Sequence, residues 1–86
     1  ENIPNPFNPA TNIKYELLVS GKVEIIIYDI MGRKVRTLYD GVQEAGLKSV
    51  LWDSADDNGI GLGTGIYFYT IKTGTDFKKG RMLLLK

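Results

Sequence analysis

The sequence predicts an all-β fold, an antiparallel β-sandwich of about six to seven short strands. Three observations carry this prediction. Apolar and polar residues alternate with a period of two in several segments, and turn signals separate these segments at intervals of about ten residues. Isoleucine and valine are frequent and glycine recurs often, so no window favours a helix. A chain of 86 residues has room for one core only.

The first half of the chain contains the clearest alternation. Residues 12–17 place apolar side chains on one side only, which predicts a half-buried strand. Residues 22–30 are apolar on both faces and therefore predict a central strand. A strand with exposed basic side chains, Arg36 among them, is expected at 34–39. Residues 40–46 contain two glycines and are interpreted as a connection, before another strand at 47–52.

The second half repeats this pattern after a long loop. Residues 53–65 are rich in aspartate and glycine and predict the longest loop. Strands are expected at 65–73 and 77–86, joined by a tight turn at 74–76. The whole arrangement is typical of an immunoglobulin-like sandwich. The expected core consists of inward-facing residues from these strands, namely Tyr15, Ile25, Ile27, Trp52, Tyr67, Tyr69 and Leu84.

Residues 1–11 carry every proline in the chain and are interpreted as a linker, so the sandwich is expected to span residues 12–86. Within this segment Phe7 is expected to pack onto the domain, because a large aromatic side chain is costly to leave exposed. The chain begins with glutamate rather than methionine, which indicates a piece of a longer protein.

Composition excludes several function classes. The chain has no cysteine and no histidine, which makes a triad hydrolase, a zinc finger and a haem protein improbable. A net charge of +1 argues against a general nucleic-acid or membrane-surface binder, which needs a broad positive field. No cofactor, metal or catalytic site is predicted.

The acidic loop has two readings. Clustered aspartates suggest calcium, which prefers several oxygen ligands, but Asp53, Asp56 and Asp57 do not follow the EF-hand spacing. The alternative is a metal-free turn, because aspartate and asparagine bond to nearby backbone and Gly59 adopts positive φ easily. Adjacent carboxylates at Asp56 and Asp57 seldom converge on one atom, so catalysis is not expected.

The aromatic residues also have two readings. Trp52, Tyr67 and Tyr69 would suit a sugar-stacking platform in a carbohydrate-binding domain. Aromatic residues at alternate positions of central strands are more often core, and a sandwich usually buries one tryptophan. The core reading is therefore preferred.

Several motifs follow one another in a characteristic order. From the N-terminus they are Pro4 to Thr11, Tyr28 to Val35, Trp52-Asp53, Asp56 to Gly59, Gly65 to Tyr69, and Lys79 to Lys86. In this order they resemble the C-terminal sorting domain of proteins exported by the type IX (Por) secretion system. They also resemble the related immunoglobulin-like domain of the flagellar hook-capping protein. The Pro-Asn-Pro-Phe start and the lysine-rich, leucine-rich ending favour the sorting domain.

That resemblance implies a non-catalytic C-terminal secretion-targeting domain. Its implied partners are the outer-membrane secretion machinery, a sortase-like peptidase and an upstream cargo domain. Its implied location is the cell surface or the medium, reached through the periplasm and outer membrane. The expected recognition residues are Lys79, Arg81 and Lys86, because a strand edge with a basic terminus offers backbone hydrogen bonds and charge together.

Two other function classes stay open. One is a structural β-sandwich that joins a neighbouring domain or self-associates through its edge strands. The other is a carbohydrate-binding accessory domain of a secreted enzyme. The sequence upstream of Glu1 would discriminate best between them.

Overall fold

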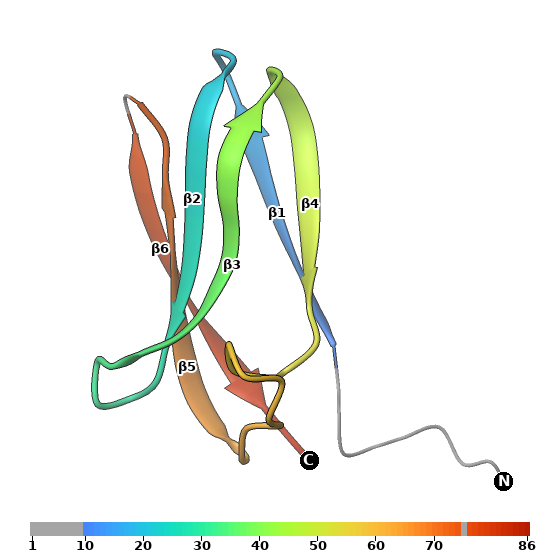
Figure 1. The fold of residues 1–86 in the computed structure, drawn as a ribbon, viewed down its shortest axis with the longest axis vertical. Coiled ribbons are helices and arrows are strands. Elements are labelled where there is room, and N and C mark those ends of the chain that lie inside the picture. Colours follow the sequence, from blue (N-terminus) through green and yellow to red (C-terminus); the bar gives the residue numbers. More distant parts are fainter. Residues whose placement is uncertain (1–9, 75) are drawn as a thin grey trace, which may run out of the picture.

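The computed structural model describes residues 10–74 and 76–86 of the chain, and in these residues every regular element is a β-strand (Figure 1). The predicted all-β, immunoglobulin-like class is confirmed. The six strands are β1 (Thr11–Leu17), β2 (Gly21–Tyr28), β3 (Lys34–Gln43), β4 (Gly46–Trp52), β5 (Gly65–Lys72) and β6 (Phe77–Leu84). In this described part of the chain there is no helix suited to crossing a membrane.

The strands form two antiparallel sheets. One contains β1 and β4, and the other has the strand order β3-β2-β5-β6. The connections β1–β2, β3–β4 and β5–β6 lie at one end of the sandwich. The β2–β3 and β4–β5 connections lie at the other end, together with the start of β1 and the end of β6 (Figure 1).

The core fills the space between the sheets. Period-two alternation explains its membership, because every second residue of a strand points to the same face. β2 contributes three fully buried residues, Val23, Ile25 and Ile27, and it lies between β3 and β5 as a central strand. Among residues 10–74 and 76–86, the buried apolar cluster consists of Ile13, Tyr15, Leu17, Val23, Ile25, Ile27, Trp52, Tyr67, Ile71 and Leu84.

Trp52 lies at the end of β4 and is 1% exposed. Its ring meets the edge of the Tyr67 ring, with centroids 5.6 Å apart and planes at 67°. Edge-to-face packing of this kind is favoured by the aromatic quadrupole. The indole Nε1 donates a hydrogen bond of 2.9 Å to the carbonyl of Ala55, so the one polar atom of the side chain is also satisfied.

Tyr69 differs from the other expected core residues, because it is only partly buried against the cluster. It stands opposite Gly80 in the β5–β6 pairing. A Cβ atom built on Gly80 would fall inside the space occupied by the Tyr69 ring. The Tyr69 ring therefore lies over the backbone of Gly80 and fills the space that a side chain at this position of β6 would occupy.

Two details of the first half differ from expectation. The segment 40–46, predicted as a connection, is mostly strand, because β3 continues to Gln43 and β4 begins at Gly46. Gly41 pairs with Val23 in β2, so its partner strand holds it in extended geometry. The β2–β3 pairing also shifts register twice, after Ile25 and after Ile27, and each shift is a bulge or irregularity that breaks the regular ladder.

The predicted linker lies mostly outside the described residues. This includes Phe7, whose expected packing onto the domain is therefore not described. The first strand begins at Thr11, one residue before the expected domain boundary.

Candidate interaction surface

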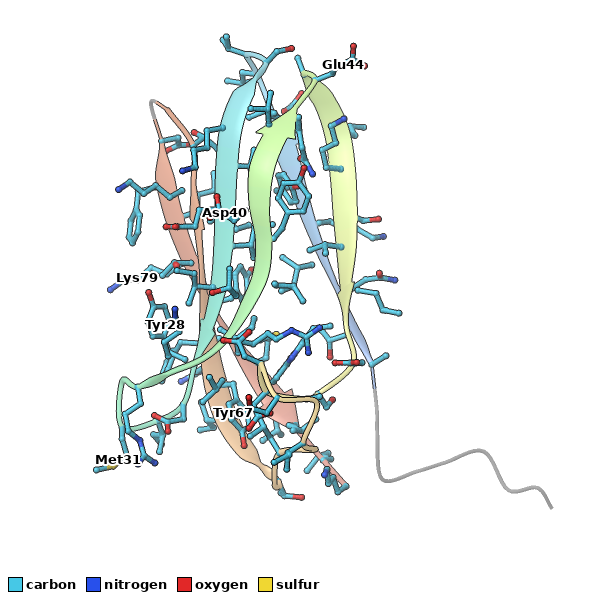
Figure 2. All side chains as sticks on the ribbon, in the orientation of Figure 1. Tyr28, Met31, Asp40, Glu44, Tyr67 and Lys79 are labelled. Atoms are coloured by element: carbon cyan, nitrogen blue, oxygen red, sulfur yellow. The ribbon has the colours of Figure 1, made fainter. Side chains whose placement is uncertain are left out.

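The outer face of the four-stranded sheet combines apolar and basic side chains. On β2, β5 and β6 these side chains alternate with the buried ones and so point away from the core. Strand pairing sets Tyr28 beside Phe68 and Phe68 beside Arg81. A second row across the same strands runs through Ile26, Thr70 and Lys79. Figure 2 shows Tyr28 and Lys79 on this outer side.

Two of the three expected recognition residues share this face. Lys79 and Arg81 are exposed and two positions apart on β6, which is the edge strand of the sheet. Lys86 lies beyond the end of β6, and its backbone N–H donates a 3.0 Å hydrogen bond to the Thr64 hydroxyl. The structure therefore groups Lys79 with Arg81 and leaves Lys86 at the end of the sandwich.

The same face exposes apolar side chains on β6. Phe77 is 58% exposed and Leu83 is 63% exposed, and their even spacing from Lys79 and Arg81 along the strand puts them on the same face. Exposed apolar groups framed by positive charge suit contact with another protein. Lysine and arginine on an edge strand also discourage unwanted strand pairing, so the basic residues have a structural role as well.

The acidic loop is held together by its own hydrogen bonds. Asp56 Oδ1 accepts bonds of 2.9 Å from the backbone N–H groups of Asn58 and Ile60. Asp57 Oδ1 accepts a 2.9 Å bond from the N–H of Thr37 in β3. Gly59 has φ 81°, a conformation that favours glycine. In the described residues, no group of three or more acidic side chains is arranged to hold a metal ion.

Arg36 was expected to be exposed, but its side chain is only 26% exposed and reaches from β3 to the loop after β4. Its guanidinium donates to Asp53 Oδ1 and to the Ala55 carbonyl, each at 3.0 Å. Ala55 O therefore accepts from both Arg36 and Trp52. The sequence could not indicate this contact, because nothing local connects an arginine to a loop about 20 residues away.

Asp29 organises the β2–β3 turn. Its Oδ1 accepts 2.9 Å bonds from the N–H groups of Met31 and Arg33, and its Oδ2 accepts from Arg33 Nε at 2.9 Å. These bonds hold the pKa of Asp29 below its ordinary value. The bond from the Arg33 backbone contributes most, followed by the Arg33 guanidinium and the Met31 backbone. The carboxylate is thus the form that stabilises the turn.

We expect the stabilising effect of Asp29 to depend on pH. A lowered pKa in the folded state means that the contribution is present above the ordinary aspartate pKa of about 3.9 and is lost as pH falls through the folded value. Asp29→Asn should therefore melt below wild type at pH 7, and the gap should narrow on acidification below about pH 4. Thermal melts of both proteins between pH 7 and below about pH 4 measure this difference in melting temperature. A gap that stays constant with pH would contradict the assignment.

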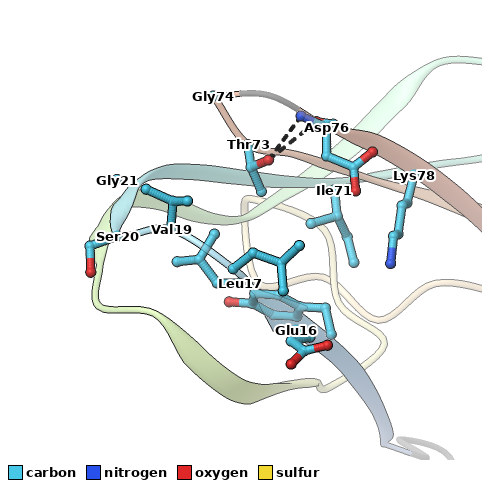
Figure 3. Close-up of a pocket in the computed structure, with 12 residues that line it drawn as sticks. Glu16, Leu17, Val19, Ser20, Gly21, Ile71, Thr73, Gly74, Asp76 and Lys78 are labelled. Carbon is cyan, nitrogen blue, oxygen red and sulfur yellow. Dashed lines mark hydrogen bonds between the residues drawn. The ribbon is translucent and has the colours of Figure 1, made fainter.

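A groove of about 160 Å³ opens between β1, the β1–β2 turn and the β5–β6 hairpin (Figure 3). Its apolar lining includes Tyr15, Leu17 and Ile71. The Tyr15 hydroxyl donates a 2.6 Å hydrogen bond to Gln43 Oε1. Burial raises the pKa of Tyr15, so the phenol stays protonated at neutral pH.

One protein family matches the chain over most of its length. The family model of the FlgD Ig-like domain matches residues 10–76, which include β1 to β5. This chain belongs to the FlgD Ig-like domain family. The crystal structure of FlgD from P. aeruginosa is similar to it, with a TM-score of 0.69 and 28% sequence identity over 87% of this chain. The FlgD-like chain spans 58% of that structure. No curated protein sequence matches this chain.

These matches correct the functional prediction. The predicted type IX sorting domain is wrong, because the matching family and the matching structure are both FlgD. The related flagellar domain, also expected from the motifs, is the supported relative. The two segments that favoured a sorting domain, 4–7 and 79–86, lie outside the matched range. These two segments therefore gave no information about residues 10–76, which the family model matches.

Proposed function

We propose that this FlgD Ig-like domain is a non-catalytic structural module of a protein that acts in flagellar hook assembly at the cell surface. The match of the FlgD Ig-like family to residues 10–76 carries the proposal. In this role its partners are neighbouring protein subunits rather than outer-membrane secretion machinery. The similarity to FlgD from P. aeruginosa supports the same role.

The use of the polar side chains is consistent with a structural role. Asp29, Asp56 and Asp57 accept hydrogen bonds from backbone N–H groups, and Arg36 ties a loop to β3. These groups serve turns and loop attachment. The apolar and basic outer face of β2, β5 and β6 then supplies the surface that a neighbouring subunit would contact.

The proposal is tested in the source bacterium with the full-length parent protein. Deletion of residues 10–86 is expected to abolish hooks seen by electron microscopy and to stop swimming. Immunoblotting checks that the shortened protein persists in the cell. Cells that form normal hooks and swim with this deletion would overturn the proposal.

A second variant avoids loss of the whole domain. Lys79→Glu/Arg81→Glu reverses charge on the outer face, and exposed changes usually alter stability by only about 0.5 kcal/mol. If this face contacts a neighbour, hook number falls while the isolated domain melts normally. A normal number of hooks would show that the neighbouring subunit contacts another face of the sandwich.

A further inference from the structure

Strand β1 has a pairing partner on one side only. It pairs with β4 in continuous register from Thr11 opposite Trp52 to Leu17 opposite Gly46. Its sheet contains no third strand in the described residues. The other edge of β1 therefore presents backbone N–H and C=O groups without a strand to accept them, which is a template for pairing with another chain.

The other sheet edges carry features that discourage such pairing. β3 has two register shifts against β2. β6 carries the exposed cations Lys79 and Arg81. β4 places Lys48 opposite the buried Tyr15, on the inward face of its sheet. Bulges, edge cations and inward-pointing charges are the recognised protections of edge strands. β1 has neither a bulge nor an inward-pointing charge. Its one exposed cation, Lys14, stands two positions from the exposed anion Glu16, so the strand carries no net charge, and it contains neither proline nor glycine.

The sequence of β1 is self-complementary. We propose that the free edge of β1 pairs with the β1 edge of a second copy of this chain, antiparallel and with a two-fold axis at Tyr15. In this register Lys14 faces Glu16 of the second copy, and Glu16 faces Lys14 of the second copy. Both side chains are exposed on the outer side of the sheet. The result is a continuous four-stranded sheet, β4-β1-β1-β4, with an isologous interface.

Charge selects this register over its neighbours. A shift by two residues one way sets Lys14 opposite Lys14, and a shift the other way sets Glu16 opposite Glu16. Like charges directly opposite one another destabilise a strand pair. A shift by one residue would set the buried residues of one copy opposite exposed residues of the other, so that the two cores would lie on opposite sides of the joint sheet. Only the register centred on Tyr15 keeps both cores on one side of the joint sheet and pairs opposite charges twice.

Exposed apolar groups lie where the second copy would extend. Leu18 and Val19, which follow β1, are 78% and 70% exposed. In the proposed register they come opposite Asn12 and Thr11 of the second copy. The groove lined by Tyr15 and Leu17 lies beside the same strand (Figure 3). Pairing therefore removes apolar surface from water besides forming backbone hydrogen bonds.

The dimer goes beyond the proposed function, and the two can fail independently, because one is measured with the purified domain and the other in cells. Sedimentation of the purified domain over a concentration series is expected to show a monomer–dimer equilibrium. Lys14→Glu or Glu16→Lys alone should raise the dimer dissociation constant about tenfold, since each creates two like-charge pairs. The double exchange Lys14→Glu/Glu16→Lys restores both opposite-charge pairs and should restore the dimer.

Lys34→Glu is the matched control, because it makes the same charge change at an exposed position of β3 and should leave the dimer unchanged. A domain that stays monomeric at every concentration would overturn the proposal. So would a double exchange that associates no better than the single variants.

The register is tested separately by disulfide trapping, which the chain permits because it has no cysteine of its own. An equimolar mixture of Lys14→Cys and Glu16→Cys places the two thiols directly opposite each other, within the Cα separation that a disulfide accepts. It also keeps the remaining Lys14–Glu16 pair. The mixture is expected to cross-link faster than either variant alone. Equal rates in all three samples would rule out this register.

Discussion

Replacing Trp52 with alanine is expected to lower the free energy of unfolding by about 3 to 5 kcal/mol. The indole is 1% exposed, and its removal leaves a cavity beside the Tyr67 ring, 5.6 Å away between centroids. The hydrogen bond to Ala55 is lost as well. The total free energy of unfolding of a native domain is about 5 to 15 kcal/mol, so the variant should be largely or wholly unfolded on mild heating.

Urea unfolding followed by circular dichroism measures this loss, since the chain has a single tryptophan and its fluorescence disappears with the mutation. Trp52→Phe is the control, because it keeps much of the buried area but lacks the Nε1 donor. It should fall between wild type and alanine. An alanine variant with wild-type stability and lost glycan binding would instead support the alternative that Trp52 belongs to a sugar-stacking platform.

The second large effect is expected from the smallest residue of β6. Gly80→Ala should lower the free energy of unfolding by about 1 to 3 kcal/mol, the usual cost of inserting a methyl group where no space exists. The new Cβ meets the rigid ring of Tyr69, which cannot bend away as a flexible chain end would. The ring must leave its place over the strand, and with it part of its contact with the core.

A double-mutant cycle with Tyr69→Ala isolates this contact. If the ring causes the clash, the two changes together cost less than the sum of the single variants. Gly21→Ala is the matched control, because it also lies in a strand but a Cβ there meets nothing within 4 Å. Additive losses at Gly80 and Tyr69 would show that the ring does not limit the size of residue 80.

Most of the fold could be predicted from alternation, because the signal is local. Ile13 and Leu17 mark the buried face of β1, and the two apolar faces of residues 22–30 mark β2 as central. The length of β3 could not be predicted, because Asp40 and Gly41 have the chemistry of a turn and only their partners in β2 hold them extended.

The surface was harder to predict than the core. Exposure of Lys79 and Arg81 follows from their alternation in β6. The attachment of Arg36 to the Asp53–Ala55 loop depends on chain geometry that no local pattern encodes. The free edge of β1 likewise becomes visible only when the strand order is known, although the Lys14–Tyr15–Glu16 sequence that makes it self-complementary could be read beforehand.

The two ends of the sandwich differ in what they are joined to. β1 starts and β6 finishes at one end, whereas the β1–β2, β3–β4 and β5–β6 turns all lie at the other (Figure 1). Any polypeptide fused before β1 or after β6 therefore leaves from the first end and does not obstruct the three turns. Sequences grafted into these turns would be held side by side on a rigid β-scaffold, as the hypervariable loops of an antibody domain are, which makes the domain a candidate framework for selected binding loops.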